Sequence, residues 1–497
     1  MALTKQALSY LLNDTDMKLS NFVGNKFVPP ADGAYLDSVD PSTGKRWLRV
    51  PDSSRVDVED AIEAASKAFE DWSNTSAEHR SSLMNKLADI VEQNIDEYAK
   101  VESRDQGKPI TLARTMDIPR VVHNFRFFAA AIRTQTNPSH IMQERYHTVS
   151  FVKNDPVGVA ALICPWNLPV YLLIFKLAPA LACGNTVVCK PSEVTSASAW
   201  VLMHSLVDAG FPSGVVNMVI GTGPGVGDPL ITSEKVPLIS FTGSTGVGKM
   251  INTKAAPLNK KISLEMGGKN AAVIFADVNM ETVLPGLVRS CFTNQGEVCL
   301  CTSRIFVQRA IYKNFLEKFA ALAKELKVGC PTDPSTNIGA LVSKAHYEKV
   351  ASYIALAEKE GLQINCGGIA RLNGPLTGGY FIAPTVISGL SDDCRLMREE
   401  IFGPVVVVAP FETAEEVVKR VNASEYGLSA TVWSDSIDNV TFVANRVRVG
   451  TVWCNCWLVR DLTMPFGGTK QSGLGREGLE DSIHFYTEQK NVCIKLS

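Results

Sequence analysis

The sequence lacks several features that would assign it to a class at once. Its 49 Lys and Arg residues are balanced by 51 Asp and Glu residues, so no basic excess points to nucleic acid or to a membrane surface. No apolar run approaches the ~20 residues of a membrane-spanning helix, and the first residues show no secretory signal pattern. We therefore expect a cytoplasmic protein that binds neither nucleic acid nor membranes.

The pattern of a structural metal site is also missing. The twelve cysteines include the close pairs Cys299/Cys301 and Cys454/Cys456, but both have C-x-C spacing rather than the C-x-x-C of zinc ribbons. The seven histidines do not cluster with them. Cys189 and similar residues lie in apolar segments, where a reduced thiol behaves as a small hydrophobic side chain. We predict reduced thiols and no metal.

Short apolar runs alternate with helical patterns along most of the 497 residues. We expect helices at 56–72, 78–102, 169–181, 197–209, 311–326, 344–360 and 414–421, and strands at 157–163, 186–189, 215–219, 238–241, 272–275, 305–308 and 405–410. This alternation is typical of parallel sheets covered by helices on both faces. It predicts two α/β domains that meet near Leu264, with polar extended segments suited to pairing with another subunit.

A glycine-rich turn follows the strand expected at 238–241. Residues 243–249 fit the phosphate-loop template, except that Met250 stands where a magnesium-binding Ser or Thr belongs. The G-x-G-x-x-G pattern is absent from this region, because the glycines at 221, 223, 225 and 227 alternate instead. A glycine turn that opens a helix still offers free N–H groups to an anion. The turn therefore suits a dinucleotide better than it suits a nucleotide hydrolase.

Three polar residues stand at positions where chemistry is plausible. Cys299 lies in a polar loop, although a lone cysteine is more often a buried small hydrophobe, and Cys301 is an equal candidate by position. Glu265 ends a strand before Gly-Gly, so it is either a salt-bridged carboxylate or a base of raised pKa. Asn167 follows the first apolar strand, where it is either a helix N-cap or an oxyanion donor.

Seven short motifs occur in one order along the chain. They are PWNLP at 165–169, KPSE at 190–193, FTGST at 241–245, LEMGGK at 264–269, QGEVC at 295–299, EEIFGP at 399–404 and PFGGTKQSGLGRE at 465–477. Together they resemble the aldehyde dehydrogenase superfamily over essentially the whole chain. The resemblance implies an α/β fold with two Rossmann-like parallel-sheet domains and an oligomerisation arm.

The same resemblance implies a division of the chain and a cofactor. Residues 1–135 and 154–264 would form an NAD-binding domain, residues 265–465 the catalytic domain, and residues 136–153 and 466–497 the arm of a homodimer or homotetramer. The residues implied in NAD binding are Ile163, Pro165, Trp166, Lys190, Ser192, Glu193, Gly223, Gly227, Phe241, Gly243, Ser244, Gly267, Glu400 and Phe402. A carboxylate at Glu193 would repel a 2′-phosphate, so NAD is favoured over NADP.

The resemblance also assigns the chemistry. Cys299 becomes the nucleophile rather than Cys301, Glu265 the general base, and Asn167 an oxyanion donor together with the Cys299 N–H. Thiolate addition to an aldehyde makes an alkoxide that can expel hydride, and the resulting thioester is hydrolysed by water activated through Glu265. Glu297 departs from the glutamine that is frequent at its position, which would place a negative charge near the thiol.

Substrate choice depends on two arginines, Arg120 and Arg460. They are either structural residues paired with Asp117 and Asp461, or a fork for a substrate carboxylate. Asn455 and Leu458 fall in the segment that is expected to line the aldehyde tunnel.

Runs around both arginines resemble the 2-aminomuconic semialdehyde branch of the superfamily, which belongs to the kynurenine pathway. That branch would take a small aldehyde that carries a carboxylate. The alternatives are 2-hydroxymuconic semialdehyde, retinal or aliphatic aldehydes, a coenzyme A-acylating relative, or a non-catalytic protein with this fold.

Overall fold

Two mostly parallel sheets organise the protein, seen here in a computed structural model that describes residues 1–13 and 16–496. The first sheet has the strand order β22-β12-β11-β8-β9-β10-β2-β3. Its strands are β2 (Asn21–Val23), β3 (Lys26–Val28), β8 (Val159–Ile163), β9 (Thr186–Lys190), β10 (Val216–Met218), β11 (Leu238–Thr242), β12 (Lys261–Glu265) and β22 (Gly473–Leu474). The five central strands run parallel, and antiparallel strands close both edges.

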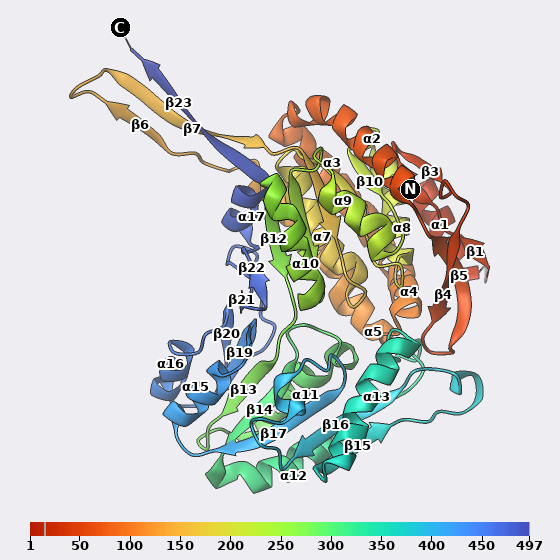
Figure 1. Cartoon of the computed structure of the whole chain (residues 1–497), viewed down its shortest axis with the longest axis vertical. Helices are drawn as coiled ribbons and strands as arrows, with labels where there is room; N and C mark the ends of the chain where they lie inside the picture. The colour runs from red at the N-terminus through yellow and green to blue at the C-terminus, as the bar shows by residue number, and fades with distance from the viewer. Residues whose placement is uncertain (14–15, 497) are drawn as a thin grey trace.

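Helices cover both faces of this sheet (Figure 1). One face packs against α3 (Ala77–Glu92), α7 (Pro169–Ala182) and α8 (Ala197–Ala209), and the other against α2 (Arg55–Ser73) and α10 (Thr245–Ala255). Every residue of β8 and β9 is buried. Their apolar runs therefore reflect burial on two faces, as the sequence predicted.

The second sheet has the order β15-β16-β17-β14-β13-β19-β20. Its strands are β13 (Asn270–Ile274), β14 (Thr302–Gln308), β15 (Gln363–Ile369), β16 (Ile382–Ser388), β17 (Val405–Phe411), β19 (Ser429–Trp433) and β20 (Thr451–Cys454). It lies between α13 (Lys344–Lys359), α15 (Ala414–Asn422) and α16 (Ile437–Ala444) on one face and α11 (Met280–Phe292) and α12 (Arg309–Glu325) on the other. The predicted α/β class with two parallel sheets is confirmed.

One expected helix is wrong in its extent. The pattern over 78–102 predicts a single helix, but the structure has α3 and then α4 (Ile95–Gln106), with a break at Asn94. The Asn94 amide donates to the Ile90 carbonyl at 2.7 Å. An asparagine side chain that bonds the preceding turn competes with helix continuation, which explains the break.

Three strands form a separate antiparallel sheet that projects from the body (Figure 1). They are β6 (Ser139–Met142), β7 (Thr148–Pro156) and β23 (Thr487–Lys495). Of the segment 466–497, only β23 belongs to this sheet; β22 instead joins the edge of the first sheet beside β12, and α17 (Leu479–Tyr486) follows.

The described residues contain no helix with the length and apolar character that a membrane span requires.

Candidate active site

A cavity of about 150 Å³ is lined by loops that follow strands of the first sheet and by loops that lead into strands of the second. Asn167 comes from the loop after β8, Ser244 from the loop after β11, and Cys299 from the loop before β14. The carboxyl ends of parallel strands, where α/β sheets bind ligands, thus face the loop that carries the thiol. The cavity brings Asn167 and Cys299 together, as the sequence predicted for an active site.

The loop before Cys299 has an unusual backbone. Asn294, Gln295 and Gly296 have φ angles of 53°, 55° and 72°, a left-handed conformation that is costly for residues other than glycine and asparagine. A Cβ on Gly296 would lie 2.2 Å from the Gly403 carbonyl oxygen, so glycine is required there. After the turn, the Asn270 amide donates to the Cys299 carbonyl at 2.6 Å. The thiol therefore stands on a loop that is held on both sides.

Asn167 is almost fully buried and bound to that same loop. Its Nδ2 donates to the backbone carbonyl of Glu297 at 2.9 Å. The backbone carbonyl of Asn167 accepts from the Asn294 Nδ2 at 3.0 Å. An amide nitrogen has two hydrogens, so one N–H of Asn167 is free of this bond. Asn167 thus retains a donor, and it lines the same cavity as Cys299.

Cys299 lines the cavity and is partly buried. Burial, together with the negative charges of Glu265 and Glu400, raises the pKa of Cys299 to about 12, and the positive charge of Arg460 lowers it. Glu297 is not among the largest influences on the pKa of the thiol, which include Glu265, Glu400 and Arg460. The expectation that Glu297 would act on the thiol through its charge therefore gains no support here, and its carboxyl lies instead against Gln106 and Val342.

Glu265 ends β12 and is buried. Burial and the nearby Glu477 carboxylate raise its pKa well above the usual range, while Lys176 and Arg460 lower it. One carboxyl oxygen has no hydrogen-bond partner among the described residues and lies where a Cβ on Gly467 would come within 2.7 Å. Glu265 is thus a buried acid with a raised pKa, next to the cavity-lining Met266 and Gly267.

The ion pair between Lys176 and Glu477, which was not predicted from the sequence, acts on Glu265. Lys176 lies on α7 with 1% of its side chain exposed, and its Nζ is 2.9 Å from the Glu477 carboxylate. A lysine within the otherwise apolar run of 169–182 was the available signal, because an unpaired buried ammonium is costly. This pair adjusts the charge around the buried Glu265 carboxyl.

One end of the cavity is built from the loop before β17. The Glu400 carboxylate accepts from the Gly268 N–H at 2.8 Å, and a Cβ on Gly267 would overlap it. Phe402, with a left-handed φ of 63°, stands edge-on to Trp166 with ring centroids 5.4 Å apart. His346 and Lys349 of α13 line the same space and were not predicted.

The glycine turn after β11 also lines the cavity. Gly243 packs so closely on the Phe241 ring that a Cβ would come within 2.5 Å of it. Ser244 caps α10 by accepting from the Val247 N–H. The first N–H groups of a helix have no partner within it, and the space beside Gly246 is open. This turn can receive an anion.

A second polar group follows β9. The Lys190 Nζ is 3.3 Å from the Glu193 carboxylate, and the Ser192 hydroxyl accepts from the Val194 N–H. The aliphatic part of Lys190 packs beside Gly227, at the end of the short turn that begins at Gly223. Ile163 pairs with Lys190 across β8 and β9, so these residues lie side by side at the carboxyl ends of two central strands of the first sheet.

The two predicted substrate arginines lie on an aromatic wall. The Arg460 guanidinium carbon is 3.7 Å from the Phe466 ring centre and 4.7 Å from that of Phe175, and Arg120 is 5.9 Å from Tyr171. Tyr171 and Phe175 stack on each other along α7.

Neither arginine side chain forms an ion pair or a hydrogen bond within residues 1–13 and 16–496. Asp117 pairs with Lys108, and Asp461 accepts from the Thr463 N–H. Asp117 and Asp461, the partners expected if the arginines were structural, therefore interact with other residues.

Two other predicted substrate residues differ in their surroundings. Leu458 packs in the apolar cluster that contains Tyr171, Phe175 and Cys299. The Asn455 amide instead bonds the backbone of Ser434 through both its oxygen and its nitrogen. Its φ is 56°, so in this structure Asn455 holds a tight turn at the end of β20.

Comparison with known proteins assigns the class. The aldehyde dehydrogenase family matches residues 27–492, and the chain belongs to this family.

Among individual relatives, the chain is 54% identical to the 2-aminomuconic semialdehyde dehydrogenase of Bos taurus, over 96% of this chain and 98% of that protein. It is also 54% identical to the protein of the same name from Danio rerio, over 97% and 99%. The fold matches the NAD+ complex structure of aldehyde dehydrogenase from Bacillus cereus with a TM-score of 0.94 and 36% identity, over 99% of each chain. The nucleotide-hydrolase interpretation of residues 243–249 is thereby excluded.

The raised pKa of Cys299 makes its reactivity dependent on pH. Because the thiolate is the reactive form, iodoacetamide should alkylate Cys299 about tenfold faster for each pH unit between 7 and 9. Arg460→Ala should slow the reaction at any fixed pH in this range, since it removes a charge that lowers the thiol pKa. Peptide mass spectrometry separates Cys299 from the exposed Cys454 and Cys493. A rate independent of pH above 7 would contradict the assignment.

Proposed function

We propose that this protein oxidises 2-aminomuconate 6-semialdehyde to 2-aminomuconate with NAD, a step of tryptophan catabolism through the kynurenine pathway. The observation that carries the choice of substrate is the pair of unpaired arginines, Arg120 and Arg460, on the aromatic wall beside Cys299. The names of the two relatives at 54% identity point to the same substrate.

The residues present fit NAD. The open turn at Gly243–Gly246 suits a pyrophosphate, because glycine allows close approach and the helix N-terminus favours an anion. Lys190 and Glu193 would hold the adenosine ribose, with Ser192, Gly223, Gly227 and Ile163 around them. Glu400 would bind the nicotinamide ribose, with Phe402, Trp166, Pro165 and Gly267 enclosing the ring. When bound, NAD supplies the acceptor for hydride.

Cys299 would attack the aldehyde carbon as a thiolate and form a tetrahedral alkoxide. The free N–H of Asn167 and the Cys299 backbone N–H would donate to this oxygen, where the negative charge develops. Loss of one such donor typically costs about 2.7–4 kcal/mol of transition-state stabilisation. The alkoxide then collapses with departure of hydride and leaves a thioester on Cys299.

Glu265 would complete the reaction as a general base. A carboxylate accepts a proton from water best when its pKa is near the operating pH, and burial raises the pKa of Glu265. The base must turn from Gly467 towards the thioester, since in this structure it does not line the cavity. Hydrolysis through Glu265 also distinguishes this chemistry from transfer to coenzyme A.

The carboxylate of the substrate would bind both guanidinium groups. Each lacks a protein counter-ion among the described residues, and each lies on an aromatic face that restricts its motion. Charge-assisted hydrogen bonds of guanidinium with carboxylate are the strong ones in proteins. The other end of the molecule would then pass Leu458 towards Cys299.

Removal of either arginine should therefore act on semialdehydes alone. Arg120→Ala and Arg460→Ala should each lower kcat/KM for 2-aminomuconic or 2-hydroxymuconic semialdehyde by roughly ten- to a hundredfold, the equivalent of ~1.5–3 kcal/mol per contact to a charged group. Hexanal, which has no carboxylate, should lose far less. NADH formation at 340 nm measures both.

Arg114→Ala is the matched control, because Arg114 pairs with Asp96 at the surface and should change neither substrate. If hexanal and the semialdehydes lose activity equally, the arginines are structural and the natural aldehyde is a different one.

We further propose a homodimer or homotetramer in the cytoplasm, built through the projecting sheet. Ile141, Val149, Phe151 and Ile494 lie on one face of it, because Val149 is paired with both isoleucines and Phe151 follows Val149 by two residues. Ile141, Phe151 and Ile494 are exposed. An apolar face on a projecting sheet is suited to a subunit interface. All twelve cysteines are free, as a reducing compartment would keep them.

Substitution by lysine on this face should dissociate the subunits. The double variant Ile141→Lys/Ile494→Lys is expected to halve the solution mass, or reduce it further, because two charges would be buried at the interface. Light scattering measures the mass. Ile437→Lys, at a residue 74% exposed on α16, is the control and should leave it unchanged. A monomeric wild-type protein would contradict the proposal.

A further inference from the structure

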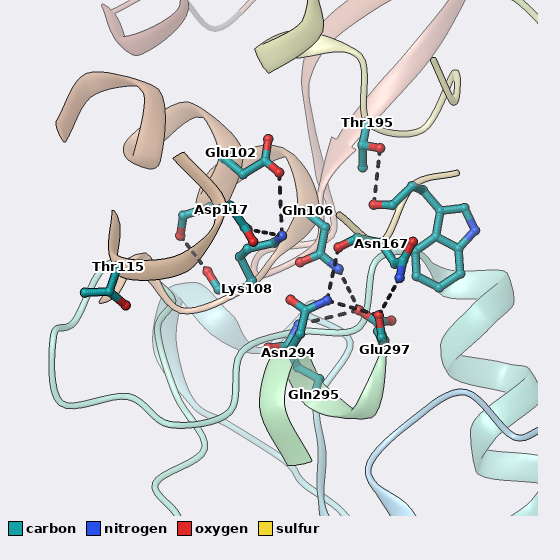
Figure 2. A network of polar contacts seen from close by, with 12 residues as sticks. Glu102, Gln106, Lys108, Thr115, Asp117, Asn167, Thr195, Asn294, Gln295 and Glu297 are labelled. Carbon is teal, nitrogen blue, oxygen red and sulfur yellow. Dashed lines mark hydrogen bonds and ion pairs between the residues drawn. The ribbon is translucent and has the colours of Figure 1, made fainter. Parts of the chain in front are cut away.

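A buried carboxylate two residues before the nucleophile has no part in the chemistry described so far. Glu297 is fully buried, and its charge is not among the largest influences on the pKa of the thiol. Figure 2 shows it at the centre of a polar network that joins Gln106 of α4 with Asn167 and the loop before Cys299. Burial raises the pKa of Glu297 to about 8, and the hydrogen bonds from Val342 and Gln106 oppose this rise. A buried carboxyl is expensive unless its partners are well placed, so these contacts indicate a role.

The groups around the Glu297 carboxyl are all donors. Gln106 Nε2 donates to Oε2 at 2.7 Å and the Val342 N–H to Oε1 at 3.1 Å, and Gln295 Nε2 is 3.5 Å from Oε2. His346 Nε2 is 3.5 Å from Oε1 but donates its hydrogen to the Phe402 carbonyl at 2.7 Å, and burial lowers the pKa of His346 to about 4, so it adds no positive charge beside Glu297. A carboxylate accepts at both oxygens, whereas an amide would turn its NH2 towards a donor.

These contacts hold a strained segment. Gln295, which has a left-handed φ of 55°, is fixed on both sides by segment 339–342: its Nε2 donates to the Ala340 carbonyl and its Oε1 accepts from the Gly339 N–H. Glu297 adds the bond to Val342 in the same segment. A conformation of this cost persists only where its surroundings enforce it.

The segment 339–342 is in turn fixed to α4. The Ala340 N–H donates to the Gly107 carbonyl at 3.0 Å, and a Cβ on Gly107 would lie 2.6 Å from the Ala340 carbonyl oxygen. The next residue, Lys108, is buried between the carboxylates of Glu102 and Asp117, as Figure 2 shows. The bond from Gln106 to Glu297 therefore runs between two well-anchored elements.

The backbone carbonyl of Glu297 links this network to Asn167 by a hydrogen bond. It accepts from the Asn167 Nδ2 at 2.9 Å and from the Asn294 Nδ2 at 3.2 Å. The two hydrogens of an amide nitrogen lie in one plane, so holding the first one sets the direction of the second. A shift of the Glu297 carbonyl would rotate the donor that Asn167 offers to the alkoxide.

We propose that Glu297 is a positioning residue that, through Gln106 and Val342, orients Asn167 for stabilisation of the oxyanion. This inference rests on the proposed roles of Asn167 and Cys299. It differs from a charge effect on the thiol, because it acts through the backbone of the loop and depends on bonds to the carboxylate.

The test is a double-mutant cycle between Glu297→Gln and Asn167→Ala, read as the rate of the first NADH burst. Glu297→Gln alone should slow the burst by about tenfold or more, less than the roughly 10²–10³ of a lost donor. KM for aldehyde and for NAD should stay within about threefold, since ground-state binding is not altered. In the Asn167→Ala background, Glu297→Gln should change the burst by less than about twofold.

Two further variants keep the test decisive if Glu297→Gln folds poorly. Gln106→Ala removes the 2.7 Å donor and should slow the burst in the same way. The exchange Gln106→Glu/Glu297→Gln restores a donor and acceptor pair and should recover the burst to within about threefold of wild type.

Asp208→Asn is the matched control for loss of a mostly buried carboxylate. Asp208, which lies on α8, accepts from the N–H and the hydroxyl of Thr4, and this variant should lower the melting temperature without changing the burst. Wild-type burst rates in Glu297→Gln and Gln106→Ala would overturn the inference, as would an undiminished effect of Glu297→Gln in the Asn167→Ala background. Absence of NADH from the wild-type protein with any semialdehyde would instead overturn the proposed function.

Discussion

The hydrogen bond from Asn167 to the carbonyl of Glu297 joins the two halves of the active site. Asn167 follows β8 of the first sheet, and Glu297 belongs to the loop that enters β14 of the second. The amide of Asn167 thus comes from a loop of the first sheet and the thiol of Cys299 from a loop of the second. The catalytic arrangement is therefore a property of the contact between the sheets, and the strained backbone at 294–296 is part of that contact.

Burial governs the chemistry of the charged groups. It raises the pKa of both Cys299 and Glu265, so neither group ionises as readily as it would in water. Arg460 opposes this rise at both sites. A substrate carboxylate that neutralised Arg460 would raise the pKa of Glu265 further, which would make Glu265 a stronger base. The arginine that would select the substrate thus also affects the groups that transform it.

Much of the site could be predicted from the sequence, because the motifs around Asn167, Glu265 and Cys299 are local and ordered. The parallel sheets followed from short apolar runs such as β8 and β9. Gln106 could not be found in this way: it lies 191 residues from Glu297, and only the fold brings them together. The break at Asn94 depends on a single side-chain bond, which periodicity does not reveal.

The most direct measurement is the location of the acyl group in a stalled turnover. Glu265→Gln, incubated with NAD and 2-hydroxymuconic semialdehyde, should release one equivalent of NADH and then stop, because the thioester lacks its base. Peptide mass spectrometry should find the acyl mass on Cys299. Acylation of Cys301, or steady turnover at the wild-type rate, would contradict the account.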